Sequence, residues 1–295
     1  TQEAMIARLR AEPGLRVCSA RFLCWLHEQF FLRLPAEMRF AKTESGELVP
    51  VEPGRLRERG ITVGRHEGPV TRQEIEGHLA SFDELLSPEG LVGPRKLLGL
   101  ASSHHRFLWV HPFPEGNGRV ARLLTTAYGF RIGVEENRLW TVARAFARNR
   151  EEYDAQLARA DRPRRNDLDG RGPLSEEDLV AFCAYFLRCC RDQIGFMEGV
   201  LPLSELERRY DRFLAALESE KRLSKTAAKV MRRLLPQGEL PRAQVLEIGA
   251  VKQRRATQIV KELLDLGIAR SETAYGPLRL RITAEMSVAL FPALA

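Results

Sequence analysis

The chain has 295 residues, of which 44% are hydrophobic and 29% charged, with 22 glycines and 16 prolines. This balance excludes a disordered or collagen-like chain, and the length suggests about two domains. No apolar run approaches the ~20 residues that a membrane span requires, and no secretory signal is visible. We therefore expect a cytoplasmic protein without membrane contact. The five cysteines include no C-x-x-C pair, which argues against a zinc site or a disulfide framework.

Positive charge is concentrated near the C-terminal end. Residues 221–295 carry 14 Lys/Arg and 6 Asp/Glu, a net charge of +8, whereas residues 1–220 carry 32 basic and 33 acidic residues. A basic domain attracts polyanions such as nucleic acid. Because the excess is moderate, an ordinary solvated surface is the alternative.

The first 220 residues are predicted to be mainly helical. Apolar periodicity, caps and turn residues predict helices over 15–34, 71–86, 95–110, 119–130, 140–160, 175–200 and 204–220. Thr71 with Glu74 forms a capping-box pattern, and Ser175 with Asp178 caps the later helix. Between the first two helices, residues 42–70 are rich in Gly and Pro, and the β-like run at 61–63 predicts a small hairpin.

The C-terminal segment is predicted to form a compact unit. It shows helices over 225–235, 241–250 and 252–266, followed by two β-like runs around a Tyr-Gly-Pro turn. Helix, short helix, longer helix and hairpin is the element order of a winged helix-turn-helix. Lys252, Arg254 and Arg255 at the start of the third helix would meet DNA phosphates or base edges. A protein–protein or dimerisation module is the alternative.

The segment HPFPEGNGRVAR, at 111–122, carries the strongest chemical signal. A proline-flanked loop leads into a helix N-terminus, whose backbone N–H groups and dipole form an anion site. Gly116 and Gly118 permit positive φ and a close approach of the backbone to a ligand, and Asn117 offers an amide donor. The segment therefore predicts a phosphate cradle.

Charged residues complete this cradle. Arg119 and Arg122 are three residues apart, so they project from one face of the helix and suit phosphate oxygens. Glu115 supplies the single carboxylate that, with phosphate oxygens, usually holds Mg²⁺. His111 is the one group of the segment that takes a proton near neutral pH. Singly these residues have ordinary explanations, but together they predict phosphoryl or nucleotidyl transfer from a Mg-bound nucleoside triphosphate to a hydroxyl.

The segment resembles the Fic motif, H-x-F-x-[D/E]-G-N-G-R-x-x-R. Its fixed positions match at His111, Phe113, Glu115, Gly116, Asn117, Gly118, Arg119 and Arg122. The resemblance implies a mainly α, Fido-type core with a small β-hairpin flap, followed by the winged helix that many bacterial relatives carry. Most characterised Fic proteins transfer AMP from ATP to a Ser, Thr or Tyr hydroxyl of a protein. We therefore expect a protein adenylyltransferase that uses ATP and Mg²⁺ and modifies a target protein or itself.

The resemblance also assigns roles by position. His111 would deprotonate the target hydroxyl, Phe113 would anchor the loop, and Glu115 would hold Mg²⁺. The phosphates would lie against Gly116, Asn117, Gly118, Arg119 and Arg122, with Arg119 on the β- and γ-phosphates.

Two further segments resemble parts of the family. Residues 54–69 resemble the flap, whose edge pairs with the target as an added strand. Residues 149–160 resemble the region where an aromatic residue flanks the adenine, which would be Tyr153. A packed helix tyrosine is the alternative there. Together these patterns predict a helical segment at 1–40, a Fic core at 41–200, a helical connector at 201–220 and the winged helix at 221–295.

Many Fic proteins are held inactive by a helix with the pattern [S/T]-x-x-x-E-[G/N], whose Glu pairs with the arginine equivalent to Arg119. No Ser or Thr of this sequence begins that pattern; Thr43 comes closest, but Leu48 follows its Glu47. The chain also opens with Thr1 in place of Met. We therefore expect an inhibitory helix upstream of Thr1 or on a separate antitoxin chain, and an uninhibited chain without it.

Other functions remain open from the sequence. The same cradle could hold the nucleotide in reverse for phosphorylation, or could serve AMP removal. The intact Gly118 and Arg122 favour AMP transfer, since the phosphorylating Doc-type relatives deviate in this part of the motif. A function of another class is a DNA-binding regulator, with the Fic core as a sensor. Enzyme and DNA reader are compatible in one chain.

Overall fold

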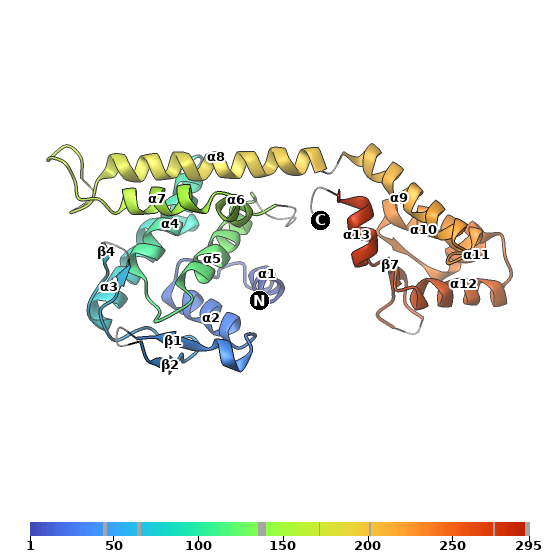
Figure 1. Cartoon of the computed structure of the whole chain (residues 1–295), viewed down its shortest axis with the longest axis horizontal. Helices are drawn as coiled ribbons and strands as arrows, with labels where there is room; N and C mark the ends of the chain where they lie inside the picture. Colours follow the sequence, from blue (N-terminus) through green and yellow to red (C-terminus); the bar gives the residue numbers. More distant parts are fainter. Residues whose placement is uncertain are drawn as a thin grey trace. The chain divides into compact units, whose positions relative to one another are not determined.

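The computed structural model describes residues 1–295 except 44–45, 64–65, 135–139, 171, 201, 274 and 293–295. Packing divides the chain into two units, Thr1–Gly195 and Phe196–Ala295. Each unit has its own apolar core, and Figure 1 shows the helices and strands of both units. In the described part of the chain, no helix is both long and apolar enough to cross a membrane.

The first unit is mainly helical, as predicted. Its helices are α1 (Gln2–Ala11), α2 (Ala20–Phe31), η1 (Ala36–Met38), α3 (Arg72–Leu86), η2 (Pro88–Gly90), α4 (Arg95–Val110), α5 (Asn117–Arg131), α6 (Val142–Arg148), α7 (Arg150–Ala160) and α8 (Glu176–Val200), whose last turn belongs to the second unit. Two antiparallel hairpins join them, β1 (Phe40–Lys42) with β2 (Leu48–Pro50), and β3 (Thr62–Val63) with β4 (His66–Glu67).

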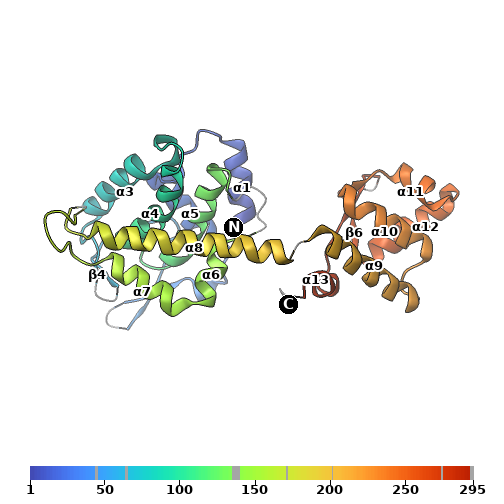
Figure 2. The same cartoon turned by 90° about the horizontal axis from the view of Figure 1, so that it is seen from above.

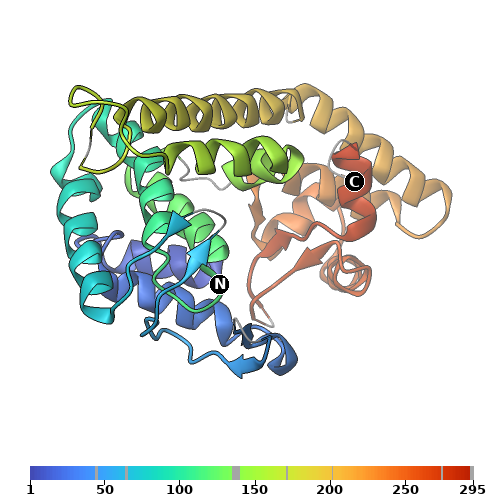
Figure 3. The same ribbon diagram turned by 60° about the vertical axis from the view of Figure 1, so that its left-hand side comes forward.

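The helix pair α4 and α5 forms the centre of this unit. The two helices pack against each other more extensively than any other pair, and the loop 111–116 joins them. Helix α4 has the predicted bounds of 95–110, and its buried side chains include His104 and His105. Figure 3 shows the two short strands of the β3–β4 hairpin beside this helix pair. The predicted hairpin is therefore present next to the motif loop.

Two predicted caps start helices where we expected them. The Thr71 hydroxyl oxygen accepts from the N–H of Glu74 at 3.2 Å, and Glu74 Oε2 accepts from the N–H of Thr71 at 3.0 Å. The Ser175 hydroxyl oxygen accepts from the N–H of Asp178 at 3.1 Å. These side chains satisfy N–H groups that a helix leaves without intrahelical partners. Helix α8, which Ser175 starts, runs alongside α7 in the first unit (Figures 1 and 2).

The predicted single helix over 140–160 is wrong in one respect, because it is broken into α6 and α7. Asn149 leaves the helical conformation, with φ −132° and ψ 68°. Its Oδ1 instead accepts from the N–H of Glu152 at 3.3 Å and starts α7. An asparagine competes with the helix backbone in this way because its short amide reaches nearby N–H groups.

The second unit contains the predicted helix, short helix, longer helix and hairpin in that order, with strand β5 and helix α13 in addition. Its elements are α9 (Leu203–Ser219), α10 (Lys225–Gln237), β5 (Glu239–Leu240), α11 (Arg242–Gly249), α12 (Gln253–Asp265), β6 (Ala269–Arg270), β7 (Leu278–Leu280) and α13 (Ala284–Leu290). The strands form one antiparallel sheet in the order β5-β7-β6. Its assignment to the winged-helix class stays a prediction.

The predicted connector at 201–220 packs within the second unit. Tyr210 and Leu214 of α9 are buried in that unit's core, and the Tyr210 hydroxyl donates to the Met231 carbonyl at 3.0 Å. Likewise, Met5, Leu9 and the apolar face of α2 are buried in the core of the first unit. Packing therefore yields two units, while the four-part division stays a prediction.

Candidate active site

The side chain of Asn117 closes the motif loop. Asn117 is 2% exposed, its Oδ1 accepts from the N–H of Phe113 at 3.0 Å, and its Nδ2 donates to the Phe113 carbonyl at 2.7 Å. Phe113 is fully buried and anchors the loop in the core. We expected the side-chain amide of Asn117 to face a ligand, but it bonds to the loop backbone at Phe113. The backbone N–H of Asn117 is the group that can donate to a ligand.

Glycine is required at the two motif positions 116 and 118 for different reasons. Gly116 has φ +82°, and a Cβ there would lie 2.7 Å from Phe31 Cε2, so this residue must be glycine. Gly118 does not have the positive φ that we expected, because it lies in the first turn of α5. A Cβ on Gly118 would meet only Arg122 Nη1, at 3.6 Å. Its missing side chain leaves the start of α5 open to a ligand.

The first turn of α5 presents backbone donors. The Gly116 carbonyl accepts from the N–H groups of Arg119 and Val120, both at 3.0 Å. Within the described residues, the N–H groups of Asn117 and Gly118 have no hydrogen-bond acceptor. Such N–H groups at the positive end of a 15-residue helix form an anion site.

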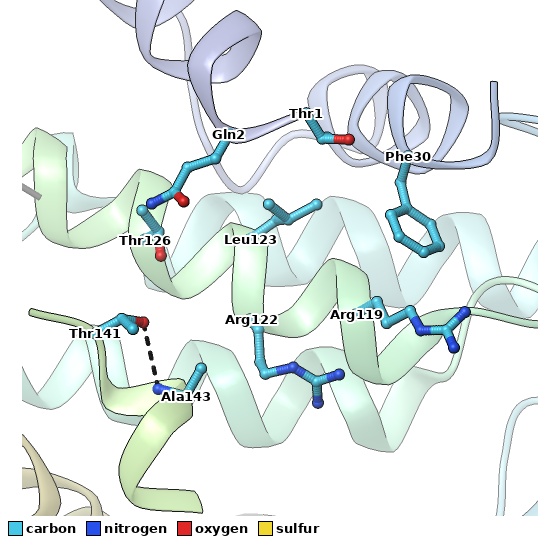
Figure 4. Close-up of a pocket in the computed structure, with 9 residues that line it drawn as sticks. All are labelled: Thr1, Gln2, Phe30, Arg119, Arg122, Leu123, Thr126, Thr141 and Ala143. Carbon is cyan, nitrogen blue, oxygen red and sulfur yellow. Dashed lines mark hydrogen bonds between the residues drawn. The ribbon is translucent and has the colours of Figure 1, made fainter. Parts of the chain in front are cut away.

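Arg119 and Arg122 project from the same side of α5 (Figure 4). They line a cavity of about 380 Å³ together with Phe30, Thr126 and Thr141. The Arg119 guanidinium carbon lies 5.3 Å from the centroid of the Phe30 ring, and burial lowers the pKa of Arg122. Among the described residues, no carboxylate forms an ion pair with either guanidinium. Two cations without counter-ions favour an anionic ligand.

His111 lies at the C-terminal end of α4 in a left-handed conformation, with φ 49° and ψ 57°. Its Nδ1 lies 3.2 Å from the carbonyl oxygen of Leu108. A carbonyl only accepts hydrogen bonds, so we assign the proton of the neutral ring to Nδ1 and the lone pair to Nε2. This is the tautomer that a base acting through Nε2 requires.

Glu115 is exposed beside the helix start, and its Oε1 accepts from the N–H of Gly116 at 2.9 Å. Mg²⁺ in nucleotide sites is commonly held by one or two carboxylates together with substrate phosphates and water. A lone exposed carboxylate next to the anion site fits that donor set.

A histidine that the sequence did not single out holds the same loop. His27 is fully buried, with its ring stacked between Phe31 and Phe113 at centroid distances of 4.4 and 4.1 Å. Its Nδ1 accepts from the N–H of Gly54 at 2.8 Å, so Nε2 carries the proton and donates to the Glu115 carbonyl at 3.2 Å. Burial lowers the pKa of His27 to about 4. The ring is therefore a neutral link at pH 7.

Tyr153 is placed in the core. It is 8% exposed, it stacks on Phe146 at 4.4 Å, and its hydroxyl lies 2.8 Å from Nε2 of the fully buried His104. Nδ1 of His104 lies 2.7 Å from the hydroxyl of Thr125. This packing accounts for Tyr153 as a core tyrosine, and its adenine contact stays a prediction. The remaining predicted residues, Lys252, Arg254 and Arg255, belong to the second unit.

Known proteins match the segment that contains this loop. Residues 18–128 match the model of the Fic/DOC family. The chain is 30% identical over 122 residues to the protein adenylyltransferase fic-1 of Caenorhabditis elegans, over 41% of this chain and 23% of that protein. It is 35% identical over 91 residues to the protein adenylyltransferase Fic of Nematostella vectensis, over 30% of this chain and 20% of that protein.

A solved structure of a Fic family protein from Desulfovibrio desulfuricans G20 aligns over 94% of this chain and 73% of its own, with 18% identity and a TM-score of 0.48. The chain spans about a quarter or less of the length of the two named curated relatives. The eight motif positions lie within the matched segment, and the helical unit extends beyond that segment at both ends. On the family-model match, residues 18–128 are therefore a Fic/DOC family domain.

Proposed function

We propose that the protein is an adenylyltransferase that transfers AMP from Mg-bound ATP to a hydroxyl group of a protein. The observation that carries this proposal is the loop 111–116, which holds the His111 ring at one end and an open helix N-terminus at the other. The curated relatives named above support it, since they are named protein adenylyltransferases.

The phosphates of ATP are bound at the start of α5. The backbone N–H groups of Asn117 and Gly118 and the guanidinium groups of Arg119 and Arg122 bind the phosphate oxygens. Bound phosphate would also supply the counter-ion that the half-buried Arg122 lacks. Glu115 would hold Mg²⁺, which neutralises charge on the leaving pyrophosphate when bound.

His111 acts as the general base. Its Nε2 accepts the proton of the target hydroxyl while the hydroxyl oxygen forms a bond to the α-phosphorus. The bond between the α-phosphorus and the oxygen that bridges to the β-phosphorus breaks, and pyrophosphate leaves. The Leu108 carbonyl fixes the ring through Nδ1 and stabilises the imidazolium that forms.

Labelled ATP tests this function. With [α-³²P]ATP and Mg²⁺, wild-type protein is expected to label itself or a protein of a cell lysate, and His111→Ala to lower the rate at least ~10²-fold. His78→Ala is the matched control, because this half-buried histidine on α3 is outside the loop. Label from [γ-³²P]ATP alone would indicate phosphorylation, and release of AMP from a labelled protein would indicate AMP removal.

We infer a second function, DNA binding, for the second unit. The exposed residues of α12 and its N-cap are Lys252, Gln253, Arg254, Arg255, Thr257, Gln258, Lys261 and Asp265. The first seven include no acidic side chain, and the described residues give none of their cations an ion pair. Arginine, lysine and glutamine on one helix face are suited to phosphates and base edges.

The salt dependence of duplex binding tests this second function. Arg254→Gln/Arg255→Gln is expected to weaken binding and to reduce the slope of log K against log salt by about 2. The matched control is Arg208→Gln/Arg212→Gln on α9, because these exposed arginines are paired with Glu205. Equal effects of both double variants, or no binding by wild-type protein, would contradict DNA recognition by α12.

A further inference from the structure

Arg57 is a buried cation whose described partners are all carbonyl oxygens. It is 6% exposed, and none of its hydrogen bonds goes to a carboxylate in the described part of the chain. Burial lowers the pKa of its guanidinium. A buried charge without a counter-ion is unfavourable unless its hydrogen bonds compensate. The segments that these hydrogen bonds join therefore indicate the role of Arg57.

One side of the guanidinium binds the C-terminal end of α4. Nε donates to the His111 carbonyl at 2.6 Å, and Nη2 donates to the Val110 carbonyl at 3.2 Å. The backbone N–H of Arg57 adds a bond to the Pro112 carbonyl at 3.0 Å. Carbonyls at a helix C-terminus lack intrahelical donors and carry partial negative charge, so a cation is suited to this place.

The other side binds both ends of the β3–β4 hairpin. Nη1 donates to the carbonyls of Arg59 and Pro69, the latter at 2.7 Å. These two residues flank the hairpin, whose ends are also joined by the bond from the Gly68 N–H to the Ile61 carbonyl at 3.1 Å. A Cβ on Gly68 would lie 3.0 Å from Arg57 Nη2, so the hairpin end packs directly on the guanidinium. Figure 3 shows this hairpin beside α4 and α5.

The bond to His111 matters because of that residue's backbone. His111 has φ 49°, a left-handed conformation that residues with a side chain adopt rarely. The direction of its carbonyl and the direction of its ring are both set by this conformation. A donor fixed on the carbonyl therefore helps to hold the ring where it is.

We propose that Arg57 is a positioning residue that holds the His111 ring and the two ends of the β3–β4 hairpin in one fixed geometry. This inference rests on the proposed transfer reaction, in which His111 is the base. Arg57 touches neither the nucleotide cradle on α5 nor the reacting atoms. Its loss should therefore lower kcat through misplacement of the base and leave the KM for ATP nearly unchanged.

Guanidinium rescue distinguishes positioning from a general structural role. For Arg57→Ala we expect kcat to fall about 10²-fold, with the KM for ATP within threefold of wild type. Guanidinium chloride at tens of millimolar should restore kcat at least fivefold, and methylammonium chloride should not. Arg55→Ala is the matched control, because this exposed arginine two residues earlier pairs with Glu52 and Glu58. It should lose less than twofold and show no rescue.

Arg57→Lys covers the case in which the alanine variant does not fold. A lysine keeps the charge but has one ammonium group, which cannot span carbonyls on both sides, so we expect kcat to fall about tenfold. The proposal is overturned if the lysine variant matches wild type. It is equally overturned if folded Arg57→Ala keeps its kcat, loses it without rescue, or raises the KM for ATP in proportion.

An independent readout separates this inference from the reaction itself. In protein labelled with ¹³C-histidine, the His111 signal is assigned by its loss in His111→Ala. Arg57→Lys should shift or broaden this signal, whereas Arg55→Ala should not. If wild-type protein transfers no label but the His111 signal responds to Arg57→Lys alone, the proposed function fails and the positioning role stands. An unchanged signal overturns the positioning role whatever the activity.

Discussion

The two units of the chain differ in whether they bury polar side chains. Among the described residues, the first unit buries 13 polar or charged side chains, including His27, Arg57, His104 and Asn117, and the second unit buries none. His27, Arg57 and Asn117 hydrogen-bond to the backbone of other segments and fix it in place, whereas His104 bonds to the hydroxyls of Thr125 and Tyr153. A group of this kind is unfavourable unless its partners are present, so it specifies a geometry closely.

The contrast matches the two proposed kinds of binding. A base and a phosphate cradle must be held within a fraction of an ångström, which buried hydrogen bonds can do. A helix that meets DNA phosphates needs only exposed cations on an apolar scaffold, and its binding then depends on salt. The chain also offers convenient probes, since all three tryptophans and all six histidines lie within residues 1–195. Tryptophan fluorescence therefore reports the first unit alone.

The largest expected effect is at Asn117. Asn117→Ala leaves the N–H and the carbonyl of buried Phe113 without the amide partner, which should lower the free energy of unfolding of the first unit by about 3 kcal/mol and lower transfer at least ~10²-fold. Urea unfolding followed by tryptophan fluorescence measures the first effect. The control is Asn149→Ala, which loses one exposed cap and should cost about 1 kcal/mol. Equal losses in the two variants would contradict a special role for the buried amide.

The two motif glycines should separate stability from binding. Gly116→Ala combines a positive φ with a clash on Phe31 and should lower stability by about 2–3 kcal/mol. Gly118→Ala has space for its Cβ in a helical turn, so stability should stay within about 1 kcal/mol of wild type. Its methyl group would, however, narrow the open start of α5, so the KM for ATP should rise about tenfold. If Gly118→Ala binds ATP normally, the phosphates do not lie against this turn.

Acid should destabilise the first unit before the second. Burial lowers the pKa of His27 to about 4 and that of His104 to about 3, from an ordinary value of 6.5. Between pH 6.5 and 4 the two histidines are protonated in the unfolded chain but neutral in the folded unit. The free energy of unfolding therefore decreases as the pH is lowered, by up to about 1.4 kcal/mol per pH unit for each histidine. The second unit has no histidine, so its unfolding should change little above pH 5. This unfolding is followed as the part of the far-UV circular dichroism change that tryptophan fluorescence does not report.

The variant His27→Gln tests which ring is responsible for the acid response. Glutamine can donate to the Glu115 carbonyl without titrating. The slope of the first unit's free energy of unfolding against pH, measured between pH 6.5 and 5, should therefore decrease by the contribution of about one bound proton. An unchanged slope in this variant would show that His27 does not stay neutral in the folded state.

The smallest expected effect is in the second unit. Tyr210→Phe removes the hydroxyl that donates to the Met231 carbonyl within an otherwise apolar core. This carbonyl lies inside α10 and has an intrahelical partner available, so the loss should be only about 0.5–1 kcal/mol. Urea unfolding measures this loss in the far-UV circular dichroism transition that remains after the transition reported by tryptophan fluorescence is accounted for. A loss above about 2 kcal/mol would mean that this unit, too, depends on buried polar bonds.

Short-range sequence patterns predicted the helices whose bounds depend on contacts within a few residues. The apolar stretch 95–110, the Thr71–Glu74 box and the Ser175 cap each act within a few residues, and the helices begin where these side chains bond. The motif loop could be predicted because its functional residues lie close together in the sequence, within residues 111–122. Residues 1–40 were predicted to be helical but without a separate helix α1, and strand β5, helix α13 and hairpin β1–β2 were not predicted, since these elements are short and only packing stabilises them.

The sequence by itself determined the motif loop, the open start of α5 beside Gly116 and the helical character of the chain. Only the tertiary structure decided that Asn117 locks the loop and that His27 and Arg57 hold its two ends. The partners of these two residues are backbone groups, namely the N–H of Gly54 and carbonyls up to 88 residues away, beside the closer carbonyls at Arg59 and Pro69. Backbone N–H and carbonyl groups are the same at nearly every residue, so no spacing in the sequence could have pointed to those bonds.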